Sequence, residues 1–149
     1  MVEIAVDGVH FNRLSGHDIT ARDIKYLQTV TGSKYNPFDG GTLVEDAFAG
    51  RTEIWRATEI QVMPRRELCY FLMALEVRCG SGPRLLEIVG IAGKGYFRRA
   101  ETILPVVKQL AKAHDCAGIS GRTTSRGLRK LYEAFGAKED YRYHVLEVL

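Results

Sequence analysis

A short glycine-containing segment carries the most suggestive chemistry in this sequence. Residues 86–95 form an apolar, strand-like run that ends in a Gly-Lys-Gly turn, and an apolar stripe of helical spacing begins at residue 97. Glycines let the backbone turn so that its amides point toward a ligand, and a helix N-terminus adds partial positive charge, so this pattern favours a bound phosphate group. Two cations, Arg98 and Arg99, would strengthen the attraction.

The positive charge of the chain is concentrated around the same segment. The sequence holds 21 basic and 18 acidic residues, and residues 88–132 contain nine of the basic and two of the acidic ones. Such an excess attracts an anionic partner, either a small phosphate compound or a nucleic acid. Two interpretations stay open: the cations could bind a ligand, or they could simply lie on helix faces that are exposed to solvent. We favour the second for Lys108 and Lys112. A Gly-x-Gly turn alone does not decide between them, and no Gly-Lys-Ser or Gly-Lys-Thr ends it as in a P-loop.

The elements that position this turn follow from hydrophobic spacing and turn residues. Alternation predicts strands, apolar residues three and four apart predict helices, and short glycine or proline segments predict hairpins between the three strands before the turn. Pro105 predicts a kink or a restart in the helix that follows the turn. The expected strands are residues 2–6, 52–62, 68–79, 85–91, 116–120 and 141–149, and the expected helices are residues 18–30, 43–48, 97–114 and 125–135. Together they predict an α/β (or α+β) domain in which the strands on either side of the 97–114 helix are parallel.

The composition is that of an ordinary globular domain. The chain has 149 residues, of which 46% are hydrophobic and 26% charged, so it can bury a core without metal or disulfide support. Its three cysteines are widely spaced with no Cys-x-x-Cys pair, so we expect neither disulfides nor a metal site. Polar residues interrupt the N-terminal apolar stretch, and no apolar run is long enough to span a bilayer. We expect one domain over residues 1–149, located in the cytoplasm.

A second motif lies in the C-terminal part of the chain. Residues 127–136 read Gly-Leu-Arg-Lys-Leu-Tyr-Glu-Ala-Phe-Gly and precede a tyrosine-rich strand. This segment resembles the C-terminal motif of the Gcn5-related N-acetyltransferase (GNAT) superfamily, in which a helix that begins at Asn ends in Leu-Tyr-Glu-x-x-Gly-Phe. The turn at residues 92–95 looks like the acetyl-CoA loop of that family, usually Arg/Gln-x-x-Gly-x-Gly/Ala. Both motifs occur in the family's order and separation, and the resemblance covers residues 52–149 well and residues 1–50 only by element order.

The sequence also departs from the family pattern at several positions. Ala92 stands where the family has Arg or Gln, Phe97 falls where it has a small residue, and Pro105 interrupts the helix. Ser125 replaces the Asn of the second motif, and Ala137 replaces its final Phe. The chain therefore resembles a divergent member of the superfamily, of the bacteriophage type, in a bacterial or phage-infected cell.

The resemblance implies a fold, a cofactor and a set of site residues. The fold would be a mixed, mostly antiparallel sheet flanked by helices, with two central strands splayed around the pantetheine of acetyl-CoA and the pyrophosphate on the glycine turn. Tyr132 would be the general acid that reprotonates the thiolate, and Glu87 the general base, with Glu59 or Glu76 as substitutes. The plain structural alternatives are that Tyr132 only packs beside Phe135 and that Glu87 is a solvated strand carboxylate. The cofactor-binding residues would be Val89, Ile91, Gly93, Lys94, Gly95, Arg98, Arg99, Ser125 and Arg129.

These roles predict an acetyl-CoA-dependent N-acyltransferase that acts on an amine of a small molecule or a protein. The alternative is a catalytically silent protein of the same fold used for protein interaction, such as a phage morphogenesis factor or an inhibitor of a host enzyme, whose partner would be a virion or host protein. Nucleic acid is not an expected partner, because no aromatic platform alternates with the basic residues. We expect no membrane partner, whereas an oligomer is compatible with the sequence because a free edge on the last strand would permit a dimer.

Overall fold

The computed structural model describes residues 2–31, 40–122, 126–136, 138–140 and 143–147. Eight strands form a single sheet in the order β1-β2-β3-β4-β5-β6-β8-β7. Neighbouring strands are antiparallel throughout, except that β5 and β6 are parallel, as the sequence predicted. The strands are β1 (Glu3–Val6), β2 (Val9–Leu14), β3 (Glu53–Val62), β4 (Arg65–Arg78), β5 (Leu85–Lys94), β6 (Gly118–Arg122), β7 (Lys138–Asp140) and β8 (Tyr143–Glu147).

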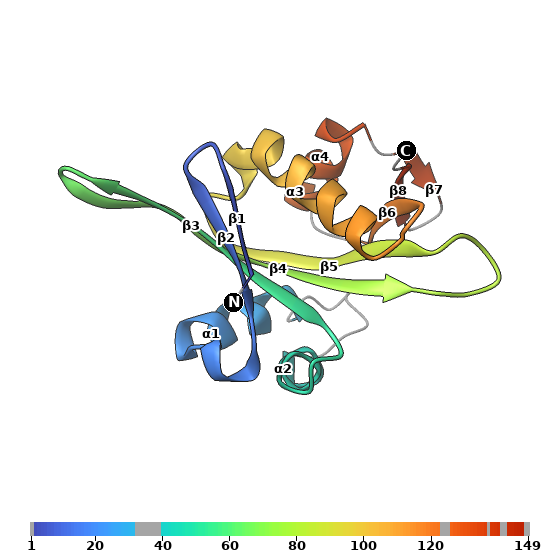
Figure 1. The fold of residues 1–149 in the computed structure, drawn as a ribbon, viewed down its shortest axis with the longest axis horizontal. Helices are drawn as coiled ribbons and strands as arrows, with labels where there is room; N and C mark the ends of the chain where they lie inside the picture. The colour runs from blue at the N-terminus through green and yellow to red at the C-terminus, as the bar shows by residue number, and fades with distance from the viewer. Residues whose placement is uncertain (1, 32–39, 123–125, 137, 141–142, 148–149) are drawn as a thin grey trace.

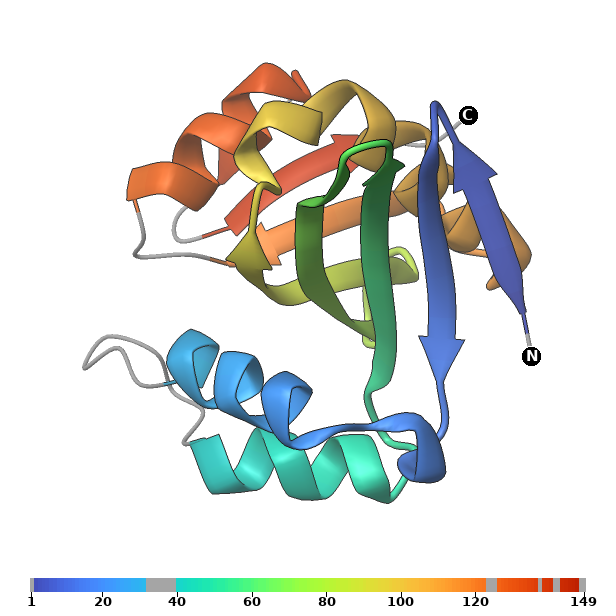
Figure 2. The ribbon, with the colours of Figure 1, turned by 90° about the vertical axis from the view of Figure 1, so that its left-hand side faces the viewer.

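Helices cover both faces of this sheet. Figures 1 and 2 show α1 (Ala21–Thr31) and α2 (Gly40–Phe48) side by side on one face, and α3 (Ala100–Ala113) and α4 (Arg126–Ala134) on the other. Two short 3-10 helices, Gly16–Asp18 and Phe97–Arg99, lead toward α1 and α3. The larger core lies on the α3 and α4 face and includes Trp55, which is 1% exposed. A smaller core lies on the α1 and α2 face.

The parallel strands β5 and β6 stay together for only part of their length. They pair from Leu85 with Gly118 to Ile88 with Gly121. Beyond Ile88, β5 continues to Lys94 in contact with β4. Among the described residues, none pairs with the edge of β5 opposite β4 from residue 89 onward, so the sheet opens there. This is the splay that the resemblance implied, and we call it the β5–β6 opening.

Several boundaries differ from those predicted. The strand Val9–Leu14 was missed because His10, Asn12 and Arg13 made it look like a polar interruption, and Lys138–Asp140 was also missed. The first long helix begins at Ala21 instead of residue 18, because Thr20 caps it: the Asp23 N–H donates to Thr20 Oγ1 at 3.3 Å, and the Thr20 N–H donates to Asp23 Oδ2 at 2.9 Å.

The helix after the glycine turn is one helix. It runs from Ala100 to Ala113 through Pro105, so of the two predicted alternatives, a kink or a restart, the restart does not occur. Val107 and Ala111, which belong to the predicted apolar stripe, are buried. Phe97 at the start of that stripe is 51% exposed, and Ile103, Val106 and Leu110 complete the buried face instead.

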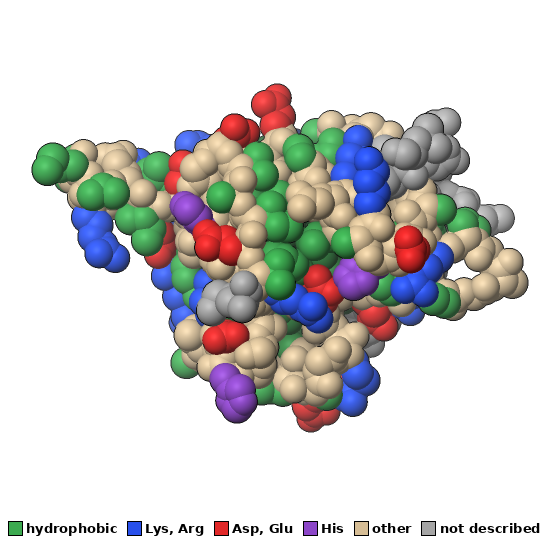
Figure 3. Space-filling view, in the orientation of Figure 1, with side chains coloured by type: hydrophobic (Ala, Val, Ile, Leu, Met, Phe, Trp, Pro, Cys, Tyr) green, Lys and Arg blue, Asp and Glu red, His purple; other side chains and the backbone are tan. Residues whose placement is uncertain are grey.

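The outer part of the β3–β4 hairpin projects from the body as an arm (Figure 1). β2 pairs with β3 only up to Thr58, and β5 pairs with β4 only from Tyr70, so the hairpin between these residues has no strand on either side. Its tip carries Val62 and Met63, which are 82% and 89% exposed. Figure 3 shows hydrophobic side chains gathered at the end of this arm, with basic side chains beside them.

The last strand is not an edge. β8 lies between β6 and β7 in the sheet, so the free edge that we expected on it belongs to the three-residue strand β7 among the strands described. No described helix is both long and apolar enough to cross a membrane. Cys69, Cys79 and Cys116 are free thiols.

Candidate active site

Gly93 and Gly95 shape the turn by lying close to the backbone of β4. Gly93 has a φ of +136°, and a Cβ there would lie 2.4 Å from the carbonyl oxygen of Tyr70. Gly95 has a φ of +82°, and a Cβ there would lie 2.9 Å from the carbonyl oxygen of Leu68. Any larger residue would therefore push the turn away from β4, so these glycines fix the path of the chain into α3.

The three basic residues of the turn have different surroundings. Arg99 is held in place, since it donates to Glu59 at 3.1 and 2.8 Å and to the carbonyl oxygen of Gly95 at 2.9 Å. The Lys94 ammonium donates to the carbonyl oxygen of Glu67 at 3.2 Å and is otherwise exposed. Arg98 is exposed. The turn thus combines one structural arginine with two cations that a ligand can reach.

The start of α3 provides backbone donors at the same place. The 3-10 helix Phe97–Arg99 runs directly into α3, and the first N–H groups of such a segment have no intrahelical acceptor. They lie at the positive end of the helix dipole. A phosphate at the end of the β5–β6 opening would therefore meet backbone N–H groups, Lys94 and Arg98.

Two predicted cofactor residues, Val89 and Ile91, lie in β5 beside the opening. Their side chains are 6% and 3% exposed and belong to the two cores on opposite faces of the sheet. The groups of β5 that a ligand can reach here are backbone N–H and C=O groups along its edge, because the pairing with β6 ends at Ile88. Pantetheine carries amide groups that can pair with such an edge, so the role of these two residues would be played by their main chains.

Tyr132 lies at the closed end of the opening. It comes from α4 and is 2% exposed, and its ring packs on Gly121, the last residue of β6 that pairs with β5. A Cβ at residue 121 would come within 2.5 Å of Tyr132 Cζ. Burial raises the pKa of the Tyr132 phenol well above its usual value, and the negative charge of Glu87 and the nearby Tyr96 raise it further. The hydroxyl therefore keeps its proton at neutral pH.

Glu87 lies on β5, one residue before the last paired position. The interpretation as a solvated strand carboxylate was wrong, because Glu87 is 1% exposed and forms an ion pair with Arg78 of β4. Its charge influences Tyr132, so the two candidate catalytic groups lie near the same end of the opening. The substitutes are placed differently: Glu59 is committed to Arg99, and Glu76 is the cross-strand neighbour of Glu87.

The remaining candidates are less central. Ser125 lies outside the described residues. Arg129 is exposed on α4. Ala92, at the family's Arg or Gln position, is 6% exposed within β5. Phe97 is 51% exposed.

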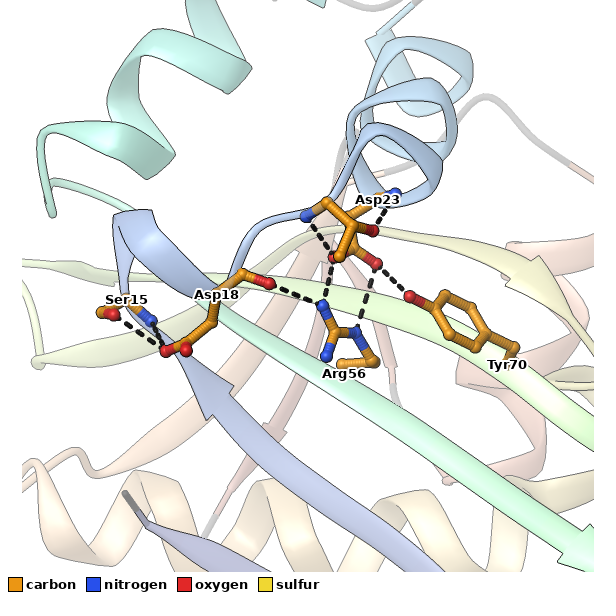
Figure 4. A network of polar contacts seen from close by, with 6 residues as sticks. Ser15, Asp18, Asp23, Arg56 and Tyr70 are labelled. Carbon is orange, nitrogen blue, oxygen red and sulfur yellow. Dashed lines mark hydrogen bonds and ion pairs between the residues drawn. The ribbon is translucent and has the colours of Figure 1, made fainter.

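A buried polar network on the α1 face escaped the sequence reasoning. Asp23 is fully buried, accepts hydrogen bonds from Arg56 and from the Tyr70 hydroxyl at 2.5 Å, and lies at the start of α1 (Figure 4). Arg56 also donates to the carbonyl oxygen of Asp18 at 2.8 Å. Burial alone would raise the pKa of Asp23, but the bonds from Arg56, from the Thr20 N–H and from Tyr70 outweigh it and hold the pKa below its usual range.

This network continues outward to the glycine turn. The Arg22 guanidinium lies 3.8 Å from the centre of the Tyr70 ring and donates to both oxygens of Glu67, at 3.0 and 2.6 Å. The bond with Arg22 lowers the pKa of Glu67. Because Lys94 also lies 3.9 Å from Glu67, a chain of charges joins α1 to the turn. The Thr20-x-x-Asp23 capping pattern was the one signal in the sequence that could have located its centre.

Comparison with known proteins supports the fold. No protein-family model and no curated protein matches the sequence. Several solved structures do match: ribosomal-protein-S5-alanine acetyltransferase from Vibrio fischeri (8% identity, 99% of this chain and 95% of that chain, TM-score 0.58), an acetyltransferase of the GNAT family from Bacillus anthracis (11%, 98% and 98%, 0.57), and the NatC complex bound to Gag peptide and CoA (10%, 95% and 99%, 0.59).

These similarities extend over nearly the whole of each chain. At 8–11% sequence identity they show that the fold is shared. The chain has the mixed, mostly antiparallel α/β fold of the GNAT acetyltransferases, as the two sequence motifs predicted. Among the similar structures are complexes with CoA and with acetyl-CoA. The bacteriophage type stays a prediction.

Proposed function

We propose that this protein is an acetyl-CoA-dependent N-acyltransferase that acts on an amine of a small molecule or a protein. The observation that carries this proposal is the β5–β6 opening. It has Tyr132 over Gly121 at its closed end, and the glycine turn and the start of α3 at the other. An extended thioester cofactor with a phosphorylated end matches such a site in both shape and charge.

The residues present fit acetyl-CoA. The edge of β5 beyond Ile88, which no described strand pairs with, can bond to the pantetheine amides, and the start of α3 with Lys94 can receive the pyrophosphate. Gly93 and Gly95 contribute by keeping the turn close to β4, because a Cβ at either position would collide with the carbonyl oxygen of Tyr70 or of Leu68.

The chemistry is the transfer of an acetyl group from sulfur to nitrogen. The amine nitrogen bonds to the thioester carbonyl carbon, the carbon–sulfur bond breaks, the amine loses a proton and the thiolate gains one. Tyr132 would supply the proton to the thiolate, because its phenol stays protonated in the core. Glu87 would accept the amine proton, with Arg78 holding the carboxylate in place.

The proposed acceptor is an amine, either of a small molecule or of a protein. Two of the similar structures are named as ribosomal-protein alanine acetyltransferases and one as a complex with a peptide, which supports including protein amines. No such observation favours the catalytically silent alternative.

The test is calorimetric titration of the full chain with acetyl-CoA. We expect a Kd of about micromolar order in the wild type and a loss of at least about tenfold in Lys94→Glu, which reverses a charge at the turn. Lys112→Glu is the matched control, because Lys112 is an exposed lysine near the C-terminal end of α3, away from the turn. A Gly95→Glu variant is unsuitable, since its side chain would collide with β4.

Failure of the wild type to bind acetyl-CoA at millimolar concentration would refute the proposal. Equal losses in Lys94→Glu and Lys112→Glu would show that the effect comes from net charge and not from a site at the turn.

A further inference from the structure

A basic pocket lies at the base of the β3–β4 arm, next to the glycine turn. Its volume is about 440 Å³, within the range of small-molecule sites. Four of its residues are basic and one is acidic. The lining residues are Arg66, Glu67, Leu68, Lys94, Gly95, Arg98 and Arg99.

The charges in this pocket are only partly balanced by the protein. Glu67 forms an ion pair with Arg22, which does not line the pocket, and Arg99 forms an ion pair with Glu59. The guanidinium groups of Arg66 and Arg98 have no ion-pair partner within the described part of the chain. Both side chains are exposed, so an incoming anion can reach them. The pocket therefore has two available arginines and a net positive field.

The directions of β4 and β5 place this pocket at the end of the proposed cofactor site. β4 and β5 are antiparallel, and Tyr70 with Lys94 is the last pair at this end. Arg66 and Leu68 belong to the part of β4 that continues beyond that pair. A ligand that follows the open edge of β5 toward Lys94 and passes the start of α3 would arrive at the pocket.

CoA carries an anionic group at the distance of one ribose from its pyrophosphate. This 3′-phosphate is a monoester with a charge of about −1.5 to −2 at neutral pH, and arginines bind such groups with paired N–H donors. We propose that Arg66 and Arg98 bind the 3′-phosphate of CoA in this pocket, so that the protein discriminates against 3′-dephospho-CoA. This inference rests on the proposed function.

Another arginine, Arg129 on α4, is among the cofactor-binding residues that the resemblance implied. The structure favours Arg66 because Arg66 lines a pocket together with turn residues, whereas Arg129 does not line it. Arg66 was not among the residues predicted for the cofactor, because it lies 28 positions before Lys94 on another strand and only the sheet brings the two together.

The experiment compares CoA with 3′-dephospho-CoA by calorimetric titration of the full chain. We expect the wild type to bind CoA about tenfold more tightly than 3′-dephospho-CoA. In Arg66→Ala this ratio should fall to about one, while the affinity for 3′-dephospho-CoA stays unchanged. Arg65→Ala is the matched control, because it removes the neighbouring exposed arginine that does not line the pocket, and it should keep the wild-type ratio.

The outcomes are distinct. Equal wild-type affinity for the two ligands would overturn the 3′-phosphate contact and leave the proposed function standing. Loss of the ratio in Arg129→Ala but not in Arg66→Ala would assign the contact to α4 and overturn it as well. Equal weakening of both ligands by Arg66→Ala would show a general effect of charge and would overturn the contact with the 3′-phosphate. Absence of binding by either ligand would refute the proposed function, and with it this inference.

Discussion

Tyr132 reaches the closed end of the β5–β6 opening because residue 121 has no side chain. The phenol ring occupies the space where a Cβ of Gly121 would be, and the same ring packs in the core with Phe135. The packing role of Tyr132 that the sequence suggested is therefore confirmed. The acid role is a proposal that this position permits, since the hydroxyl lies beside the strand edge where β6 ends its pairing with β5.

Replacing Tyr132 with Phe tests the chemical role separately from the packing role. We expect kcat to fall by about 100-fold, because general acid catalysis contributes 10²–10⁴-fold, and the affinity for acetyl-CoA to stay within about twofold. The raised pKa of the phenol means that the wild-type rate should not fall through ionisation of this group between about pH 7 and pH 9. Steady-state thiol release with an amine acceptor, together with calorimetry, gives both quantities.

The melting temperature of Tyr132→Phe provides the control for this substitution, since the ring stays in the core. Unchanged turnover in a folded variant would leave Tyr132 with a packing role only.

At the scale of elements, helix α1 is fixed to the sheet by charge as well as by apolar contact. Asp23 at its first turn binds Arg56 of β3 and Tyr70 of β4, and the neighbouring Arg22 binds Glu67 of β4. A buried carboxylate is stable only when such partners satisfy it. The register of α1 against β3 and β4 is therefore specified by a few polar groups.

Removing the charge of Asp23 should destabilise the protein in a pH-dependent way. In Asp23→Asn we expect the free energy of unfolding at pH 7 to fall by about 2–4 kcal/mol, because Arg56 loses its buried partner. The pKa of Asp23 is lowered in the folded protein, so its contribution is fully present above about pH 4 and is lost as the pH falls further. Urea unfolding of wild type and variant at pH 7 and pH 3 measures this.

Asp46→Asn is the control for Asp23→Asn, since Asp46 pairs with Arg51 at the surface and should contribute at most about 1 kcal/mol. A difference between wild type and Asp23→Asn that does not shrink at pH 3 would contradict the assignment to the carboxylate charge.

The elements show which parts of the fold a sequence can predict. β3, β4 and β5 were predicted because their apolar residues alternate between clear turns, and α4 because Leu131 and Phe135 recur at helical spacing. β2 was not predicted, because His10, Asn12 and Arg13 make three of its six residues polar and leave no continuous apolar run. Strand order and register depend on contacts distant in sequence, such as Ile88 with Gly121.

The whole molecule brings together groups from distant parts of the chain, and this limits what the sequence could predict of the site. The glycine turn was recognisable because it is local, and Tyr132 because it belongs to a local motif. The basic pocket joins residues 66–68 to residues 94–99, and the Asp23 network joins three elements. No single segment carries the pattern of either.

Ligand binding should stabilise the whole molecule, because the opening between β5 and β6 exists only in the folded sheet. At acetyl-CoA concentrations of about 100 times Kd, mass action adds about 2.7 kcal/mol, which for a chain of this size raises Tm by about 5–10 °C. Thermal denaturation with and without acetyl-CoA measures this shift. Lys94→Glu should show a clearly smaller shift at the same ligand concentration, and an equal shift in both proteins would contradict a site at the turn.

Trp55 gives the protein a single built-in optical reporter. It is the only tryptophan of the chain, it is 1% exposed, and its indole N–H donates to Glu53 at 2.5 Å. Its fluorescence should therefore have the short emission wavelength of a buried indole and should resist quenching by iodide. Since no second indole contributes, a shift to longer wavelength during heating or in urea reports the loss of the core that surrounds Trp55 on the α3 and α4 face.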